Sequence, residues 1–176
     1  VNMDQARSVA AEIGGIAVEC DVRSDEQGEA AVKAARDAHG AARISVCCAG
    51  VSESRLMLDR NGPAPLADHR RIVEIHLIGT YNINRLVAAD MADCDPVADT
   101  AERGVIINTA SIAGYDGPPG AISYNAAKAA IAAMCLPMAR ELSRHAIRVM
   151  AIAPGIFETA MVAGLRQNYV DEMTAA

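Results

Sequence analysis

Residues 104–128 read Gly-Val-Ile-Ile-Asn-Thr-Ala-Ser-Ile-Ala-Gly-Tyr-Asp-Gly-Pro-Pro-Gly-Ala-Ile-Ser-Tyr-Asn-Ala-Ala-Lys. The first seven residues are mostly apolar and β-branched, which predicts a short buried strand. The alanine-rich end predicts a helix, and glycine and proline mark a loop between the two. A strand followed by a helix is the repeating unit of α/β folds, so this stretch indicates the fold class.

The same alternation extends in both directions along the chain. The predicted strands are Ile16–Asp21, Arg43–Ala49, Gly104–Ala110 and Ile147–Ala153. The predicted crossover helices are Asp25–His39, Leu66–Met91 and Ile122–Arg144, and Asp93–Arg103 is expected to be an acidic surface loop. This order predicts a Rossmann-type, doubly wound parallel sheet with ligands at the carboxyl ends of the strands. At 176 residues, we expect 1–176 to be one domain.

The composition excludes several classes of partner. A net charge of −6 with scattered basic residues argues against a nucleic-acid surface. No run approaches the roughly 18 consecutive apolar residues that span a bilayer, and the first residues resemble no targeting peptide. The five cysteines are odd in number and show no metal-ligand spacing, so we expect reduced thiols in a soluble, cytoplasmic protein without a bound metal.

Ser111, Tyr124 and Lys128 form the strongest candidate for a catalytic site. Tyr124 and Lys128 are four residues apart in the predicted helix, so both lie on one face and the ammonium can stabilise a phenolate. Ser111 follows a predicted strand and can hydrogen-bond the substrate oxygen whose proton Tyr124 handles. The set predicts hydride transfer at a carbinol or carbonyl. The structural alternative is an amphipathic helix with a half-buried tyrosine and a solvated lysine.

The other candidate residues also lie at or just after the ends of predicted strands. They are Asp21-Val22, Cys48-Ala49-Gly50, and Pro154-Gly155. Each alone could be an ordinary turn or the end of a strand. Because parallel strands end at the same edge of a sheet, we expect them to share one binding crevice.

These residues resemble the short-chain dehydrogenase/reductase family, whose signature is a serine followed thirteen residues later by Tyr-x-x-x-Lys in a Rossmann-type fold. The resemblance covers nearly the whole chain. Three stretches resemble more narrowly the type-2 3-hydroxyacyl-CoA dehydrogenases, which oxidise 3-hydroxyacyl-CoA thioesters of fatty acid metabolism with NAD and in some cases accept hydroxysteroids. These stretches are Arg85–Ala88, Arg103–Ser111 and Ile147–Phe157.

The resemblance implies a role for each candidate residue. Asp21 and Val22 would meet the adenine, and Cys48, Ala49 and Gly50 would form the strand end beside the cofactor. Ser111 would orient the substrate oxygen, Tyr124 would be the acid/base, and Lys128 would also hold the nicotinamide ribose. Pro154, Gly155, Phe157 and Thr159 would contact the nicotinamide end. The family also implies a homo-oligomer, a dimer or tetramer, which the alanine-rich helix would allow.

The sequence departs from the family pattern at two places. His76 stands where the family usually has an asparagine that helps hold a water of the proton relay. His76 either keeps an altered form of that role or is a half-buried helix residue that slows proton exchange. The Gly-rich pyrophosphate loop of the first strand is absent, since no Gly-x-Gly occurs, and so is the final strand. We therefore expect the chain to be part of a longer protein.

Three functional hypotheses remain. The first is an NAD-dependent dehydrogenase of 3-hydroxyacyl-CoA, with hydroxysteroids or other alcohols as alternative substrates and NADP as an alternative cofactor. The second is a non-catalytic interaction protein that keeps the fold for its surfaces. The third, a hydrolase that uses Ser111, lacks both a suitable base and the Gly-x-Ser-x-Gly elbow.

Overall fold

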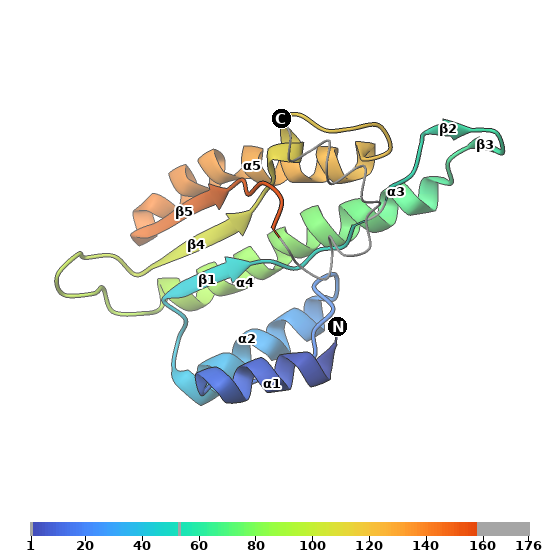
Figure 1. Ribbon diagram of the computed structural model, residues 1–176. Coiled ribbons are helices and arrows are strands. Elements are labelled where there is room, and N and C mark those ends of the chain that lie inside the picture. The colour runs from blue at the N-terminus through green and yellow to red at the C-terminus, as the bar shows by residue number, and fades with distance from the viewer. Residues whose placement is uncertain (1, 53, 158–176) are drawn as a thin grey trace.

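A parallel three-stranded sheet forms the centre of the molecule (Figure 1). The structure is a computed structural model and describes residues 2–52 and 54–157. The strands are β1 (Ile44–Cys47), β4 (Gly104–Thr109) and β5 (Ile147–Ile152), in the order β1-β4-β5. Three of the four predicted strands are therefore confirmed, and all three end at the same edge.

Helices cover both faces of this sheet, as the doubly wound class requires. In Figure 1, α4 (Gly79–Ala92) lies on one face and α5 (Ile122–Leu142) on the other. Helix α2 (Asp25–His39) packs on the outside of α4 and begins at Ser24, whose hydroxyl accepts a hydrogen bond from the backbone N–H of Gln27 at 3.2 Å. None of the described helices is long and apolar enough to cross a membrane.

The predicted helix Leu66–Met91 has an additional feature. It begins as α3 (Leu66–Val73), passes through the π-helical segment η1 (Glu74–Ile78) and continues as α4. A π-helical turn places an extra residue in the helix and changes which side chains face inward. Here the inward side chain is that of His76, which is 1% exposed.

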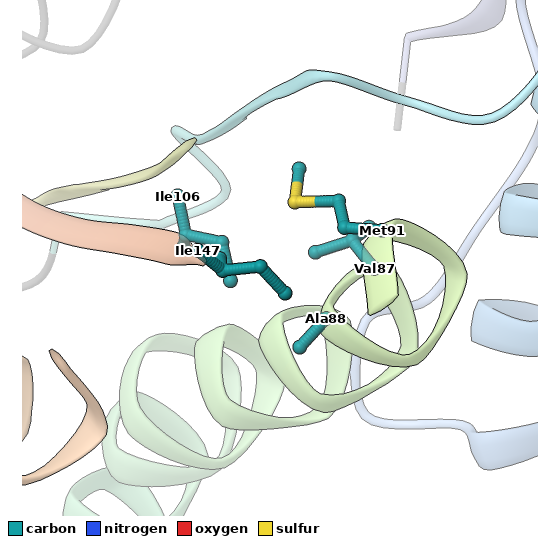
Figure 2. Packing of buried hydrophobic residues seen from close by; sticks show 5 residues of the cluster. All are labelled: Val87, Ala88, Met91, Ile106 and Ile147. Atoms are coloured by element: carbon teal, nitrogen blue, oxygen red, sulfur yellow. The ribbon is translucent and has the colours of Figure 1, made fainter. Parts of the chain in front are cut away.

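The hydrophobic core lies between α4 and the sheet (Figure 2). Val87, Ala88 and Met91 of α4 meet Ile106 of β4 and Ile147 of β5. Met91 and Ile106 are completely buried. This contact holds the helix that carries His76 against the strands whose ends carry the other candidate residues.

The prediction of a strand at Ile16–Asp21 is wrong, because this segment has no regular structure. A strand is stable only when its backbone groups pair with a neighbour, and no described strand lies beside this segment. Ile16 and Val18 are 45% and 37% exposed. The sequence pattern of a buried strand is thus present without the pairing that would make it one.

The remaining elements lie outside the predicted pattern. Helix α1 (Met3–Ile13) precedes the irregular segment, and its first turn is capped by the side chain of Asn2. A small hairpin of β2 (Leu58–Asp59) and β3 (Gly62–Pro63) projects beyond the start of α3 (Figure 1). Two short 3₁₀ turns, η2 (Ile112–Gly114) and η3 (Ser143–His145), flank α5.

Candidate active site

Lys128 is buried and is held by a backbone carbonyl group. It is 6% exposed, and its ammonium donates a hydrogen bond to the carbonyl oxygen of Thr109 at 2.6 Å. Burial lowers the pKa of Lys128, and the neighbouring Cys48 thiol acts in the opposite direction. The described contacts use one of its three N–H donors, so the other two are available to a ligand.

Tyr124 lies one turn before Lys128 on α5, as the spacing predicts. The ammonium nitrogen of Lys128 is 5.6 Å from the centre of the Tyr124 ring. The half-buried phenol therefore has a cation close by, although Lys128 donates to the backbone of Thr109 and not to the phenol oxygen. The predicted pairing of the two side chains is present in the structure.

Ser111 lies at the end of β4, where the chain turns towards α5. Its hydroxyl oxygen accepts a hydrogen bond from the backbone N–H of Ala113 at 3.1 Å, which begins η2. The next residue, Ile112, donates its backbone N–H to the carbonyl oxygen of Pro154 at 3.1 Å. The hydroxyl hydrogen of Ser111 has no acceptor in the described part of the chain and can bind a substrate oxygen. The hydrogen bond from Ile112 to Pro154 joins the ends of β4 and β5 beside it.

Gly114 explains why this loop lies so close to α5. A Cβ at Gly114 would be 2.9 Å from the backbone nitrogen of Ala129, so the loop and the helix touch backbone to backbone. Ala129 directly follows Lys128 on the helix. A side chain at position 114 would move Ser111 away from the residues of α5.

Cys48, Ala49 and Gly50 follow β1 and differ in their surroundings. Cys48 is exposed, and its sulfur is 3.4 Å from the hydroxyl oxygen of Thr109. Ala49 is also exposed, whereas Gly50 lies directly against the His76 ring. The three residues thus occupy the same sheet edge as Thr109 and Ser111.

The Asp21 loop forms the other side of this edge. The Asp21 carboxylate binds the guanidinium of Arg23, with a shortest distance of 2.6 Å, and this contact lowers the pKa of Asp21 to about 2. The Asn82 side-chain amide of α4 donates to the carbonyl oxygens of Val22 at 2.9 Å and Ser24 at 3.1 Å. The loop is therefore anchored by its backbone, while its carboxylate is engaged by a neighbour.

The residues after β5 are only partly described. Pro154 accepts the bond from Ile112, and Gly155 lies beside the Ile112 side chain. Phe157 is 66% exposed. Thr159 lies outside the described residues.

Several supporting residues were not among the predicted site residues. Asn84 of α4 donates to Asn108 of β4 at 2.9 Å, and the thiol of Cys47 donates to Asn84 at 3.1 Å. Burial raises the pKa of Cys47 to about 11. Polar side chains in apolar runs are a signal of such networks, but the sequence does not say which of them meet.

This edge suits the ribose end of a nicotinamide cofactor. The two unused donors of Lys128 can bind neutral hydroxyl groups, and Cys48 and Ala49 at the same sheet edge are exposed. The described residues contain no group of three or more His, Cys, Asp or Glu side chains that could hold a metal ion. The spare N–H donors of Lys128 fit an organic cofactor with hydroxyl groups.

Comparison with known proteins agrees with this arrangement. Residues 1–170 match the family model of the short chain dehydrogenases. The chain is 40% identical over 168 residues to 3-hydroxyacyl-CoA dehydrogenase type-2 of Drosophila melanogaster, which covers 93% of this chain and 66% of that protein. The chain thus spans less than two thirds of the length of this relative.

Solved structures show the same relationship. The structure of 3-hydroxyacyl-CoA dehydrogenase type-2 from Mycobacterium avium superposes with a TM-score of 0.87 at 34% identity, covering 99% of this chain and 68% of that one. A 7α-hydroxysteroid dehydrogenase complexed with NADH and 7-oxo glycochenodeoxycholic acid gives a TM-score of 0.84 at 29% identity, covering 98% and 65%. The predicted resemblance is confirmed, and the chain belongs to the short-chain dehydrogenase/reductase family.

Proposed function

We propose that the protein is an oxidoreductase that transfers a hydride between NAD and a secondary alcohol or ketone, with Tyr124 as the acid/base. The observation that carries this proposal is the placement of Ser111, Tyr124 and a buried Lys128 at one sheet edge. A nicotinamide cofactor supplies the hydride acceptor or donor when it is bound. Membership of a family of dehydrogenases supports the same reaction class.

Each catalytic side chain has a distinct task in this proposal. Tyr124 takes the hydroxyl proton of an alcohol or returns it to a ketone. Ser111 donates its free O–H to the same substrate oxygen. Lys128 supplies positive charge near the phenol, and its spare N–H donors hold the cofactor ribose. His76 completes the candidate catalytic set because its ring borders Tyr124.

The remaining candidate residues, at the ends of the other predicted strands, are proposed to contact the cofactor. Asp21 and Val22 would meet the adenine, and Cys48, Ala49 and Gly50 would lie beside the ribose. Pro154, Gly155, Phe157 and Thr159 would border the nicotinamide. NAD is proposed over NADP because of the family resemblance and because one of the similar solved structures contains NADH.

The proposed substrate is a 3-hydroxyacyl-CoA. The names of the relatives favour it, since both the Drosophila melanogaster protein and the Mycobacterium avium structure are 3-hydroxyacyl-CoA dehydrogenases of type 2. A hydroxysteroid is the second candidate because of the similarity to the 7α-hydroxysteroid dehydrogenase structure. Relative kcat/KM for a 3-hydroxybutyryl thioester and for a hydroxysteroid will distinguish the two.

Replacement of Tyr124 by Phe tests the assigned chemistry. The variant removes the ionisable hydroxyl and keeps the ring, so we expect kcat to fall by about 10²–10⁴-fold while unfolding by urea is little changed. The exposed Tyr115 provides a matched control, and Tyr115→Phe should keep the rate. A Tyr124→Phe variant with more than a tenth of the original rate would refute the acid/base role.

Direct titration with NADH separates an enzyme from an interaction protein of the same fold. The dehydrogenase proposal predicts saturable binding, seen as a change in NADH fluorescence. An interaction protein predicts no saturation.

A homo-oligomer also forms part of the proposal. The outer surface of α5 carries exposed Ile122, Ala126, Ala133 and Leu136, so a second copy could approach this helix closely. Sedimentation velocity measures the oligomeric state, and a monomer at working concentration would contradict this part.

A further inference from the structure

The His76 ring occupies an enclosed position between the backbone after β1 and the Tyr124 side chain. It is 1% exposed and projects from the π-helical turn η1. Its Nε2 atom is 2.7 Å from the carbonyl oxygen of Val51 and 3.0 Å from the Val51 backbone nitrogen. The ring therefore joins the middle of the long helix to the chain immediately after the Cys48–Gly50 segment.

The other ring nitrogen, Nδ1, is buried and has no hydrogen-bond partner among the described residues. Nε2 can either donate to the Val51 carbonyl or accept from the Val51 N–H, so either neutral tautomer is satisfied at Nε2. An imidazolium would carry a hydrogen on both nitrogens, and the hydrogen on Nδ1 would have no acceptor. The contacts thus favour a neutral ring.

The ring also packs against two residues of the candidate active site. Its centre is 5.3 Å from the centre of the Tyr124 ring, and the two planes meet at 87°, an edge-to-face arrangement. On the other side, a Cβ at Gly50 would be 2.5 Å from Cε1 of His76. The imidazole therefore lies between the strand end and the phenol and packs against both.

We propose that His76 is a positioning residue for Tyr124, and that it holds the phenol and the Val51 backbone in place only while its ring is neutral. This inference rests on the proposed function in one respect, the assignment of Tyr124 as the acid/base. This role differs from a proton relay. It depends on the packing of the His76 ring against Tyr124 and on its contact with the Val51 backbone, and His76 transfers no proton.

The groups around the ring explain why a charge would disrupt the site. From α5 the ring faces Lys128, whose positive charge opposes a second cation, together with the phenol of Tyr124. From the β1 end it faces the Val51 backbone, and the Cys48 thiol lies near Lys128. On its own element Glu74 is 52% exposed and is paired with Arg23.

Burial is the main reason that the pKa of His76 is lowered, with Lys128 acting in the same direction and the Val51 hydrogen bond opposing both. The neutral form therefore persists to a pH below the ordinary range of histidine. Protonation at lower pH should release the ring from its position and disturb Tyr124. The protein should thus lose activity in acid for a reason separate from the ionisation of Tyr124.

Ketone reduction is the direction in which this effect can be isolated. Tyr124 acts there as an acid, so acidification keeps it in its active protonated form, and a loss of rate in acid must come from another group. We expect the rate of ketone reduction by the original protein to fall in acid, below pH 6.5, the ordinary pKa of histidine; this fall is the acid limb of its pH profile.

His76→Asn should remove that acid limb or move it to lower pH, and His76→Gln should do the same. The exposed His39, changed to Asn, is the matched control and should leave the limb in place.

Nitrogen NMR of the histidine rings provides a readout that does not need activity. The four histidines of the chain can be labelled with ¹⁵N, and His76→Asn identifies the His76 signals. We expect His76 to remain neutral to a pH below 6.5, the ordinary pKa of histidine, and the ring signals of Tyr124 to shift with the same midpoint as His76. Tyr124 signals that are insensitive to the His76 titration would overturn the proposal, as would an acid limb unchanged in both His76 variants.

The two proposals fail in different ways. Full activity of Tyr124→Phe removes the acid/base assignment, whereas the NMR coupling of His76 and Tyr124 is unaffected by that result. Loss of the coupling removes the positioning role and leaves the acid/base assignment intact. If His76→Asn does not fold, His76→Gln identifies the His76 signals in its place, and the NMR titration of the original protein still decides the question.

Discussion

The two sides of the sheet edge are held in very different ways. At the Tyr124 side, Lys128 and His76 are buried and each is fixed by a backbone group, Thr109 or Val51. At the Asp21 side, the Asp21 and Arg23 side chains are 39% and 43% exposed and pair with each other. Catalysis requires reacting groups at fixed distances, and buried side chains with backbone partners can provide them. An exposed ion pair such as Asp21–Arg23 contributes little to the stability of the fold.

The largest effect on activity is expected when Lys128, on the buried side, is changed to Met. Met keeps an unbranched side chain and removes the charge and its donors, so we expect kcat to fall by about 100-fold or more. Because burial of an ammonium is costly, stability to urea should be unchanged or higher. Turnover assays and urea titration of the same sample check both effects.

Lys33→Met provides the matched control for this experiment. Lys33 is the only other lysine of the chain, is exposed, and pairs with Asp37 at 2.5 Å on α2. Its replacement should keep the rate. A Lys128→Met variant that retains the original rate would show that the buried lysine is only structural.

An intermediate effect is expected for Asn82→Ala, which tests how the Asp21 loop is anchored. The change leaves the carbonyl oxygens of Val22 and Ser24 without their partner, and we expect a loss of about 1–2 kcal/mol in the free energy of unfolding. Urea titration measures this. Asn61 is exposed, and the described hydrogen bond at this residue uses its backbone N–H, so Asn61→Ala should have little effect. Equal stability of the two variants would mean that the loop is held by packing alone.

The smallest effect is expected for the Asp21–Arg23 pair. The pKa of Asp21 is lowered from 3.8 to about 2, so its stabilising contribution is present above pH 4 and is lost as the pH falls from about 4 to about 2. Because the pair is exposed, this loss should be slight. The free energy of unfolding of Asp21→Asn and of the original protein, measured between pH 5 and pH 2, should converge at the acid end. A constant difference across this range would contradict the assignment.

The sequence correctly predicted those strands that pair with a neighbouring strand in the sheet. The apolar runs at β1, β4 and β5 and the helices α2 and α5 lie within two residues of the predicted bounds. The segment Ile16–Asp21 carries the same pattern but remains irregular, because a hydrophobic pattern cannot supply a hydrogen-bonding partner. Pairing, unlike periodicity, depends on residues that are distant in the chain.

In the candidate site, too, some features were predicted from the sequence and others appear only in the structure. The spacing of Tyr124 and Lys128 on a helix, and the position of Ser111 after a strand, determined that these side chains could act together. The sequence also identified His76 as a departure from the family pattern. It did not indicate the Lys128 contact with Thr109, the Asn82 bonds or the enclosure of the His76 ring.

Local spacing by itself predicted the fold class and the candidate catalytic set, because the periods of helices and strands are built into the backbone, and the motif residues themselves carried the family resemblance. The tertiary structure alone decided which nitrogen of His76 is bonded, which side chains are buried and which backbone carbonyl binds Lys128. These properties arise where Val51, Thr109 and α5 meet. They depend on distances between segments that only the folded chain brings together.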